Sequence, residues 1–199
     1  LLLDNLPSAA LSEPKNLRFK TGKRKKIWNK NCLSIGLASG FMEPLESTSI
    51  HLIQSTIMRF FSLFPHKADF EVEMNYFNNS IDEEFKSIRD FLVLHYKLTT
   101  RDDSELWNYC RNMEIPDSLK EKLELYRSGS WIERNNKELF GVDSWLAVLN
   151  GQSAQANSYN PLVDTLPESE LEKIMQDSRE VLSQCASSMP NHEDFILNN

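Results

Sequence analysis

The sequence predicts an α+β protein, in which short β-structure at the N-terminus is followed by a mostly helical body. Two patterns predict this class: apolar and polar residues alternate near the N-terminus, and apolar residues then recur every three or four positions over two long stretches. With 199 residues, of which 40% are hydrophobic, the chain can bury a core. It has no run of about 18 to 20 apolar residues, and Leu1–Leu3 meets Asp4 at once, so a transmembrane or secreted protein is disfavoured.

The β-structure is expected before residue 41. Apolar and polar residues alternate over 17–21, and Thr21-Gly22 is typical of a turn, so we expect strands over 16–21 and 24–29 that form a hairpin. The run CLSIGLASG at 32–40 favours a buried strand that leads into a tight loop.

The rest of the chain is expected to be helical. Apolar periodicity predicts helices over 48–64, which Pro65 ends, and over 69–98. Shorter helices are expected over 104–113, with Ser104 as the cap, and over 117–127, closed by Gly129. Thr165 and Glu168 form a capping box, and the last helix is expected to bury one face, made of Leu171, Ile174, Val181 and Leu182. Residues 150–161 are predicted to form a loop.

The formal net charge is −7, yet one segment is strongly basic. Its bases are Lys15, Arg18, Lys20, Lys23, Arg24, Lys25, Lys26 and Lys30. A polyanion site and a hairpin with a basic outer face both explain this segment, and the second is favoured because the acidic remainder would repel a phosphate backbone. We therefore expect no nucleic-acid partner and no membrane partner.

Cysteine and histidine spacing argues against a metal site. Cys32, Cys110 and Cys185 form no CxxC pair, so the sequence indicates neither a disulfide framework nor a zinc site, and a reducing, cytoplasmic location is expected. The four histidines have no metal-ligand spacing, so no metal ligand is assigned.

The segment most suggestive of chemistry is GLASGFMEPLESTSI at 36–50. Its small residues allow the close approach of a flat cofactor, or equally close packing of strand on helix. Glu46 lies just before the predicted helix, with Ser47 and Thr48 as candidate caps. The free amides there suit a small anion, although Glu46 can also be only a favourable carboxylate at a helix N-terminus.

Three segments carry a family resemblance: LRFKTGKRKKIWNKNC at 17–32, GLASGFMEPLESTSIHLIQ at 36–54 and RDFLVLHYKLTTRDDSELW at 89–107. Together they resemble the C-terminal half of flavin-dependent tryptophan halogenases, and the likeness runs from about Leu17 onward. The EPLEST block at 43–48 is its most specific part. The resemblance implies the C-terminal part of a flavin monooxygenase-like fold, with residues 1–47 as the end of the FAD-binding domain and 48–199 as a helical substrate-binding region.

The resemblance also implies an activity and its cofactors. A separate flavin reductase would supply reduced FAD, the flavin hydroperoxide would oxidise chloride or bromide, and the hypohalous product would halogenate an electron-rich arene such as an indole. Site roles follow by position. Glu46 would be the catalytic and substrate-facing glutamate, Thr48 and Ser49 would hold halide through backbone amides, and Leu37 and Ile50 would contact the flavin. His95 and Phe140 would line the arene pocket, although His95 can equally be a core histidine.

The sequence also departs from the family pattern. In KELFGVDSWLAVLNGQ, which starts at Lys137, Leu139 and Phe140 fall near an expected Phe-Trp pair and Ser144 falls near an expected asparagine. A simpler indole, a pyrrole, a phenol or a carrier-bound arene therefore remains an alternative to free tryptophan. GxGxxG and WxWxIP are absent, so we expect a portion of a longer enzyme that alone neither binds FAD well nor halogenates. A flavin hydroxylase and a non-enzymatic helical interaction module remain the alternative functions.

Overall fold

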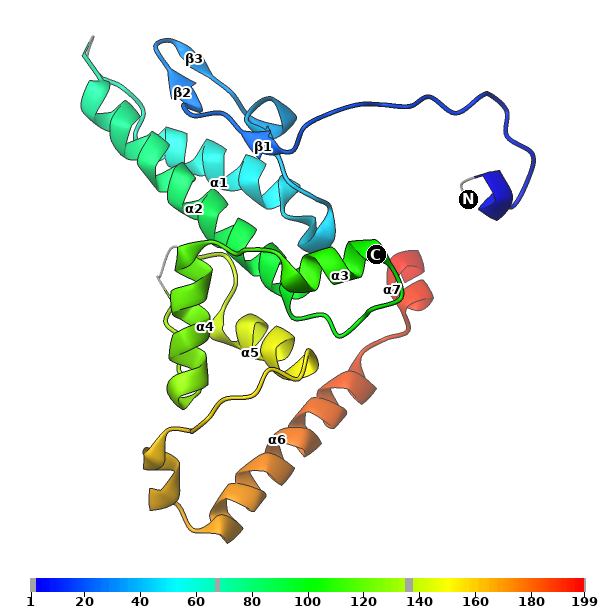
Figure 1. Cartoon of the computed structure of the whole chain (residues 1–199), viewed down its shortest axis with the longest axis vertical. Helices are drawn as coiled ribbons and strands as arrows, with labels where there is room; N and C mark the ends of the chain where they lie inside the picture. Colours follow the sequence, from blue (N-terminus) through cyan, green and yellow to red (C-terminus); the bar gives the residue numbers. More distant parts are fainter. Residues whose placement is uncertain (1–2, 67–68, 135–137, 199) are drawn as a thin grey trace. The chain divides into compact units, whose positions relative to one another are not determined.

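The computed structural model describes residues 3–66, 69–134 and 138–198, and it is mostly helical with a few short strands (Figure 1). This confirms the α+β class. The strands are β1 (Gly22–Lys23), β2 (Trp28–Asn29), β3 (Cys32–Leu33) and β4 (Gly40–Phe41). The helices are α1 (Ser49–Ser62), α2 (Glu71–Lys97), α3 (Glu105–Asn112), α4 (Asp117–Gly129), α5 (Val142–Gly151), α6 (Glu168–Ser188) and α7 (His192–Asn198). Short 3₁₀ turns are η1 (Leu3–Asn5), η2 (Gly36–Ala38), η3 (Leu45–Ser47) and η4 (Pro161–Thr165).

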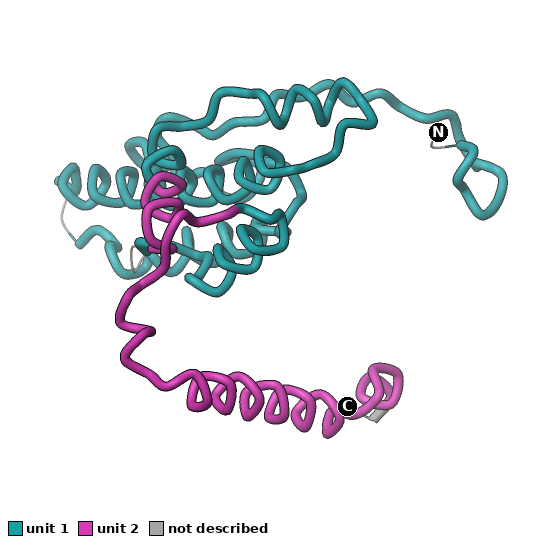
Figure 2. Tube along the Cα trace, turned by 60° about the horizontal axis from the view of Figure 1, so that its bottom comes forward, with its two compact units in different colours: residues 1–121, 133–154 teal, residues 122–132, 155–199 magenta. Residues whose placement is uncertain are grey.

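The chain divides into two compact units, coloured separately in Figure 2. Unit 1 comprises residues 1–121 and 133–154, and unit 2 comprises residues 122–132 and 155–199. All strands, α1, α2, α3 and α5 belong to unit 1. Each helix in the described part of the chain is too short or too polar to cross a bilayer.

The strands pair differently from the predicted hairpin. β2 pairs antiparallel with β3, and β1 pairs antiparallel with β4. Gly22, expected in a turn, lies in β1, whereas the hairpin turns at Lys30, which has a positive φ of 53°. Residues 16–21 form no strand. Of the predicted strand over 32–40, only Cys32–Leu33 and Gly40 are in strands, and the η2 turn lies between them. The small residue at Gly40 serves close packing, because an added Cβ would lie 2.9 Å from the Gly22 carbonyl oxygen.

Helices α1 and α2 form the main packing layer of unit 1, as the periodicity predicted. They run side by side in Figure 1, and α2 continues through Asn79 without interruption. The β2–β3 hairpin packs against them through Trp28, whose ring stacks on Phe70 at 5.4 Å and meets Phe60 and Phe77 edge-on. Buried Ile27, Ile81 and Phe85 complete this core, which holds the β-structure on α2.

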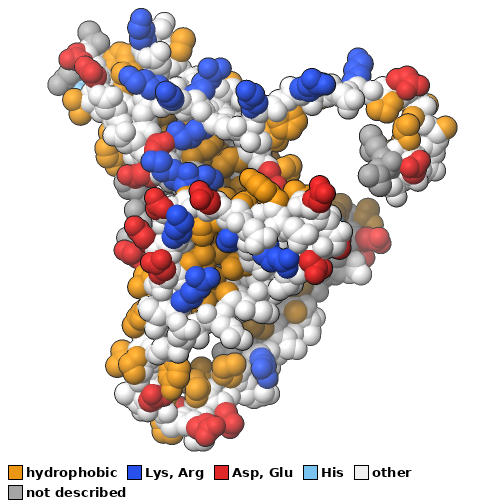
Figure 3. All heavy atoms as spheres, viewed as in Figure 1, with side chains coloured by type: hydrophobic (Ala, Val, Ile, Leu, Met, Phe, Trp, Pro, Cys, Tyr) orange, Lys and Arg blue, Asp and Glu red, His pale blue; other side chains and the backbone are white. Residues whose placement is uncertain are grey.

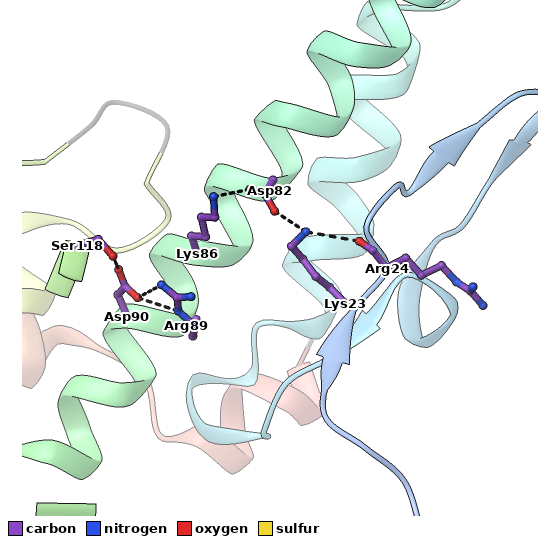
Figure 4. Close-up of polar contacts among 7 residues, drawn as sticks. All are labelled: Lys23, Arg24, Asp82, Lys86, Arg89, Asp90 and Ser118. Carbon is purple, nitrogen blue, oxygen red and sulfur yellow. Dashed lines mark hydrogen bonds and ion pairs between the residues drawn. The ribbon is translucent and has the colours of Figure 1, made fainter. Parts of the chain in front are cut away.

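Polar contacts fix β1 and the start of β2 on α2. The Asn78 side-chain oxygen accepts hydrogen bonds from the Ile27 and Trp28 amides at 2.8 and 3.0 Å, and its nitrogen donates to the Trp28 and Met74 carbonyls. Lys23 and Lys86 both pair with Asp82, as Figure 4 shows, and their hydrogen bonds lower the pKa of that carboxyl. Part of the basic segment is therefore neutralised within the fold.

The shorter helices lie close to their predicted positions. α3 and α4 match the predictions for 104–113 and 117–127, although the Ser104 side chain makes no capping hydrogen bond and Gly129 is the last residue of α4. Asp90 on α2 accepts from Ser118 and pairs with Arg89, which ties the start of α4 to α2 (Figure 4). α5 overlaps the first residues of the predicted loop, because its helix continues to Gly151.

Unit 2 corrects two predictions. The cap of α6 is Pro167, and the Thr165 hydroxyl donates to the Leu162 carbonyl, so the capping box does not form. The predicted buried face of α6 is exposed: the exposed fractions of Leu171, Ile174, Val181 and Leu182 are 37%, 48%, 58% and 69%. The 3.6-residue period predicted the helix correctly but did not predict its burial.

Candidate functional site

The EPLEST segment forms a strained turn directly before α1. Pro44 caps η3, and the Ser47 amide donates to its carbonyl at 2.9 Å. Glu46 and Ser47 then take φ values of 65° and 49°, in the left-handed region that side chains other than glycine rarely adopt. Each such residue costs about 1 to 3 kcal/mol, so the surrounding fold has to hold the turn in place. The turn points the Glu46 side chain toward the end of α2, where it meets His95.

The start of α1 leaves backbone donors open beside this turn. Thr48 is buried and serves as the cap residue, and Ser49 is the first helical residue. Within the described chain, the amides of Thr48 and Ser49 donate to no protein acceptor. The predicted side-chain caps at Ser47 and Thr48 do not form. Free amides and the positive end of a 14-residue helix make this place suitable for a small anion.

Glu46 and His95, two of the predicted site residues, contact each other. The His95 Nε2 atom lies 3.1 Å from the Glu46 Oε1 atom. The other ring nitrogen, Nδ1, lies 2.8 Å from the carbonyl oxygen of Phe91, one helical turn earlier on α2. The His95 side chain is 17% exposed and the Glu46 side chain is 37% exposed, so the pair lies partly buried at the protein surface.

An aromatic cluster continues from His95. Phe91 lies edge-on to the His95 ring at 4.8 Å and stacks on Phe140 at 3.9 Å. It also packs against Trp145 of α5, with ring centroids 5.0 Å apart. Phe140 therefore joins the same cluster as His95, although it lies far away in the sequence. Phe91 was missed from the sequence; its place four residues before His95 on one predicted helix was the available signal.

A second side-chain pair, between a carboxylate and a hydroxyl, lies beside the Glu46–His95 pair. The Tyr96 hydroxyl donates to the Glu43 Oε2 atom, and this hydrogen bond, followed by burial, raises the pKa of Tyr96 to about 12. Glu43 Oε1 is buried and has no partner in the described structure. The Tyr96 ring also stacks with Trp107 of α3. Neither Glu43 nor Tyr96 was singled out from the sequence, since nothing in the spacing joins positions so far apart.

The two predicted flavin contacts lie on neighbouring elements. Leu37 of η2 and Ile50 of α1 are 75% and 70% exposed, unusually open for large apolar side chains, and η2 packs against α1. Gly36, with a positive φ of 63°, lies against Ile53 and turns the chain there. Exposed apolar side chains next to open amides fit one wall of a flat, apolar ring system such as a flavin. These 199 residues contain no GxGxxG fingerprint for binding phosphate, so they fit only part of a flavin site.

A cavity of about 760 Å³ lies in unit 1 between the β1–β4 pair and helices α2 and α3, and Glu43 and Tyr96 are among its lining residues. Its lining is mostly apolar, with Lys23, Lys86 and Arg89 among the polar residues. Figure 3 shows lysine and arginine side chains beside hydrophobic ones on this face. The predicted site residues line no part of it. Among the described residues, no group of histidine, cysteine and acidic side chains is arranged to hold a metal ion.

Comparison with known proteins decides the family. The tryptophan halogenase family profile matches residues 1–168. This chain belongs to the tryptophan halogenase family. It is 40% identical over 118 residues to a tryptophan 6-halogenase from Streptomyces albogriseolus, a match that covers 59% of this chain and 22% of the relative.

Two solved structures agree with this family membership. A flavin-dependent halogenase from Xanthomonas campestris is 39% identical, with a TM-score of 0.89 over 98% of this chain and 39% of that one. A flavin-dependent halogenase from Brevundimonas sp. BAL3 is 35% identical, with a TM-score of 0.88 over 98% of this chain and 40% of that one. This chain therefore spans less than half the length of these relatives.

Proposed function

We propose that this chain supplies one wall of the flavin and halide site, together with much of the arene pocket, of a flavin-dependent halogenase. The observation that carries the proposal is the contact of Glu46 with His95 beside the open amides at the start of α1. Membership of the halogenase family supports it. We assign residues 1–47 to the end of the FAD-binding domain and 48–199 to the helical substrate-binding region, as the C-terminal part of a flavin monooxygenase-like fold.

The cofactor and the halide would bind on adjoining surfaces. FAD, reduced by a separate flavin reductase, would activate molecular oxygen, and that oxygen would be the oxidant that turns halide into a hypohalous acid. Leu37 and Ile50 would pack against its ring system, where their exposed side chains meet a flat apolar partner. The amides of Thr48 and Ser49 would bind chloride or bromide through hydrogen bonds that the helix dipole strengthens.

The arene would be held and deprotonated by the residues at the end of α2. Phe140 and the cluster around Phe91 offer ring faces on which an arene stacks. When a halogen bonds to an arene carbon, the ring becomes positively charged and must lose the proton on that carbon. Glu46 has a carboxylate oxygen to accept this proton, and the electron pair of the broken C–H bond then returns to the ring.

The substrate class is proposed from a relative and from the residues near Phe140. The relative from Streptomyces albogriseolus is a tryptophan 6-halogenase, so an electron-rich indole is the nearest substrate class for this chain. Leu139, Phe140 and Ser144 replace the residues that the tryptophan-specific pattern carries, which favours a simpler indole, a pyrrole, a phenol or a carrier-bound arene. A flavin reductase is the expected protein partner, and a cytoplasmic location agrees with the free Cys32, Cys110 and Cys185.

The role of Glu46 is tested by Glu46→Gln in the longest reading frame that contains these residues, with Glu71→Gln, on the exposed start of α2, as the control. Loss of a catalytic proton acceptor reduces the rate of halogenation about 10²- to 10⁴-fold. The measurement is product formation from indole with FAD, a flavin reductase, oxygen and bromide. A Glu46→Gln enzyme with at least a third of the control's rate would rule out this role for Glu46.

A further inference from the structure

The contacts of His95 determine where its protons lie. The Phe91 carbonyl oxygen can only accept a hydrogen bond, so the His95 Nδ1 atom, 2.8 Å away, must carry a hydrogen. A neutral imidazole has one ring hydrogen, and its other nitrogen is then a hydrogen-bond acceptor. That nitrogen, Nε2, lies 3.1 Å from a carboxyl oxygen of Glu46. Two acceptors would face each other there, so the contact requires a proton between them.

The proton belongs mainly to the imidazole. An imidazole is a stronger base than a carboxylate, so a proton shared by the two groups lies mainly on the imidazole. The contact is then an imidazolium that donates its Nε2 hydrogen to the Glu46 carboxylate. Glu46 Oε1 is occupied by this bond, whereas Oε2 makes no hydrogen bond within the described chain.

We propose that His95 is a positioning residue that acts as an imidazolium, holding Glu46 as a carboxylate with Oε2 free to take a proton from the substrate. The proposal deepens the proposed function and rests on it. In the reaction, the hypohalous acid gives its halogen to an arene carbon and its hydroxide leaves. The proton from that carbon goes to Glu46 Oε2, the C–H electron pair returns to the ring, and the proton then passes to hydroxide, forming water.

Among the charged groups near His95, Glu46 is the one that contacts the imidazole ring. From α2 itself, Tyr96 bonds Glu43 and Lys97 donates to the Met113 carbonyl at 2.8 Å. The neighbouring segments contribute Phe140 and Trp145, which are uncharged, and their contacts are to Phe91. Arg101 lies over the Trp107 ring and pairs with Asp103. Each of these other charged groups has its own partner in the described structure.

His51 provides an internal comparison. Its Nε2 atom lies 2.9 Å from the buried Glu84 carboxylate, which also accepts from Arg59 at 2.8 Å. That cluster links α1 to α2 and contacts none of the Glu46 or His95 atoms in the described contacts. A change at Glu46 should therefore affect His95 and not His51.

The proton assignment is tested on the 199-residue chain by NMR of the imidazole ¹⁵N nuclei as a function of pH. The four histidines are distinguished by the signals that disappear in His95→Gln. We expect His95 to keep Nδ1 protonated after its Nε2 proton is lost. In Glu46→Gln, His95 should lose its Nε2 proton at a lower pH than in the wild type, because the carboxylate that accepts this hydrogen is gone, while Glu43→Gln and the His51 signals serve as controls. A His95 titration that is the same in wild type and Glu46→Gln overturns the proposal.

The functional consequence is tested by the pH profile of kcat/KM for indole in the longest reading frame. Wild-type activity should fall more than fivefold as the imidazolium is lost at high pH. In His95→Gln, whose side-chain amide donates a hydrogen bond without titrating, this fall should be less than twofold. A fall in His95→Gln as steep as in the wild type overturns the role of His95. Because the NMR result needs no turnover, a confirmed proton with no halogenation would contradict the proposed function alone.

Discussion

Two side-chain pairs at the end of α2, Glu46 with His95 and Glu43 with Tyr96, hold the strained turn before α1. Glu46 sits at a backbone conformation that costs about 1 to 3 kcal/mol, and its carboxylate contacts His95. The next residue on α2, Tyr96, bonds Glu43 from the same loop. Two successive residues of one helix thus hold two glutamates of one segment. This double attachment is a physical reason why the strained turn persists.

The hydrogen bond between Tyr96 and Glu43 predicts that the stability of the fold depends on pH. The pKa of Tyr96 is raised to about 12, mainly by its hydrogen bond to Glu43, whereas an unfolded tyrosine has a pKa of about 10. The stability from this pair is therefore fully present below pH 10 and is lost as the pH rises toward 12.

This prediction is checked by absorbance titration of the tyrosinates. In Glu43→Gln, one tyrosine should titrate closer to pH 10 than in the wild type. Equal titration curves for the two proteins would show that the Glu43 hydrogen bond does not control Tyr96.

At the scale of elements, one amide side chain joins the hairpin to α2. Asn78 uses its oxygen for two backbone amides of β2 and the preceding residue, and its nitrogen for two carbonyls. The amides of Ile27 and Trp28 are partly buried and would lose this acceptor without Asn78. Asn78 therefore matters more to the β-structure than the two-residue strands themselves.

Asn78→Ala should lower the free energy of unfolding by about 2 to 4 kcal/mol, because two backbone donors lose their acceptor. The measurement is urea unfolding followed by tryptophan fluorescence. Asn79→Ala, at the exposed neighbouring position, is the matched control and should change stability by less than about 0.5 kcal/mol. Equal midpoints for the two variants would contradict the role of Asn78.

The helices could be predicted from the sequence, whereas the strand pairing could not. The apolar periods of α1 and α2 extend over many residues, so local pattern decides them. The strands have two residues each, and contacts distant in sequence, such as Gly22 with Phe41, decide their pairing. The Glu46, Thr48 and His95 assignments came from the family resemblance. The contact between Glu46 and His95 required the fold, since no local pattern relates the two positions.

At the scale of the whole chain, the family match ends where the exposed C-terminal helices begin. The family profile ends at residue 168, and α6 begins there. The described side chains of α6 and α7 are exposed. Within unit 2, to which both helices belong, their side chains therefore bury little apolar surface.

Deleting residues 168–199 should leave the thermal stability nearly unchanged. A loss below 1 kcal/mol corresponds to a decrease in Tm of less than about 4 °C for a chain of this size. The decrease in Tm is measured by calorimetry of the 199-residue chain and of the chain that ends at residue 167. A decrease of more than about 8 °C would mean that α6 buries its apolar residues against the rest of the protein.

The central claim is that these residues belong to an enzyme that transfers oxidised halide to an arene. Its most direct test is mass spectrometry of the product that the longest reading frame forms from indole, with FAD, a flavin reductase, oxygen and either chloride or bromide. The account predicts a product with the isotope doublet of the halide supplied, and no such product without halide. A hydroxylated product formed equally well without halide would identify a flavin hydroxylase instead, and no flavin-dependent turnover over a panel of indoles, pyrroles and phenols would favour a non-enzymatic helical module.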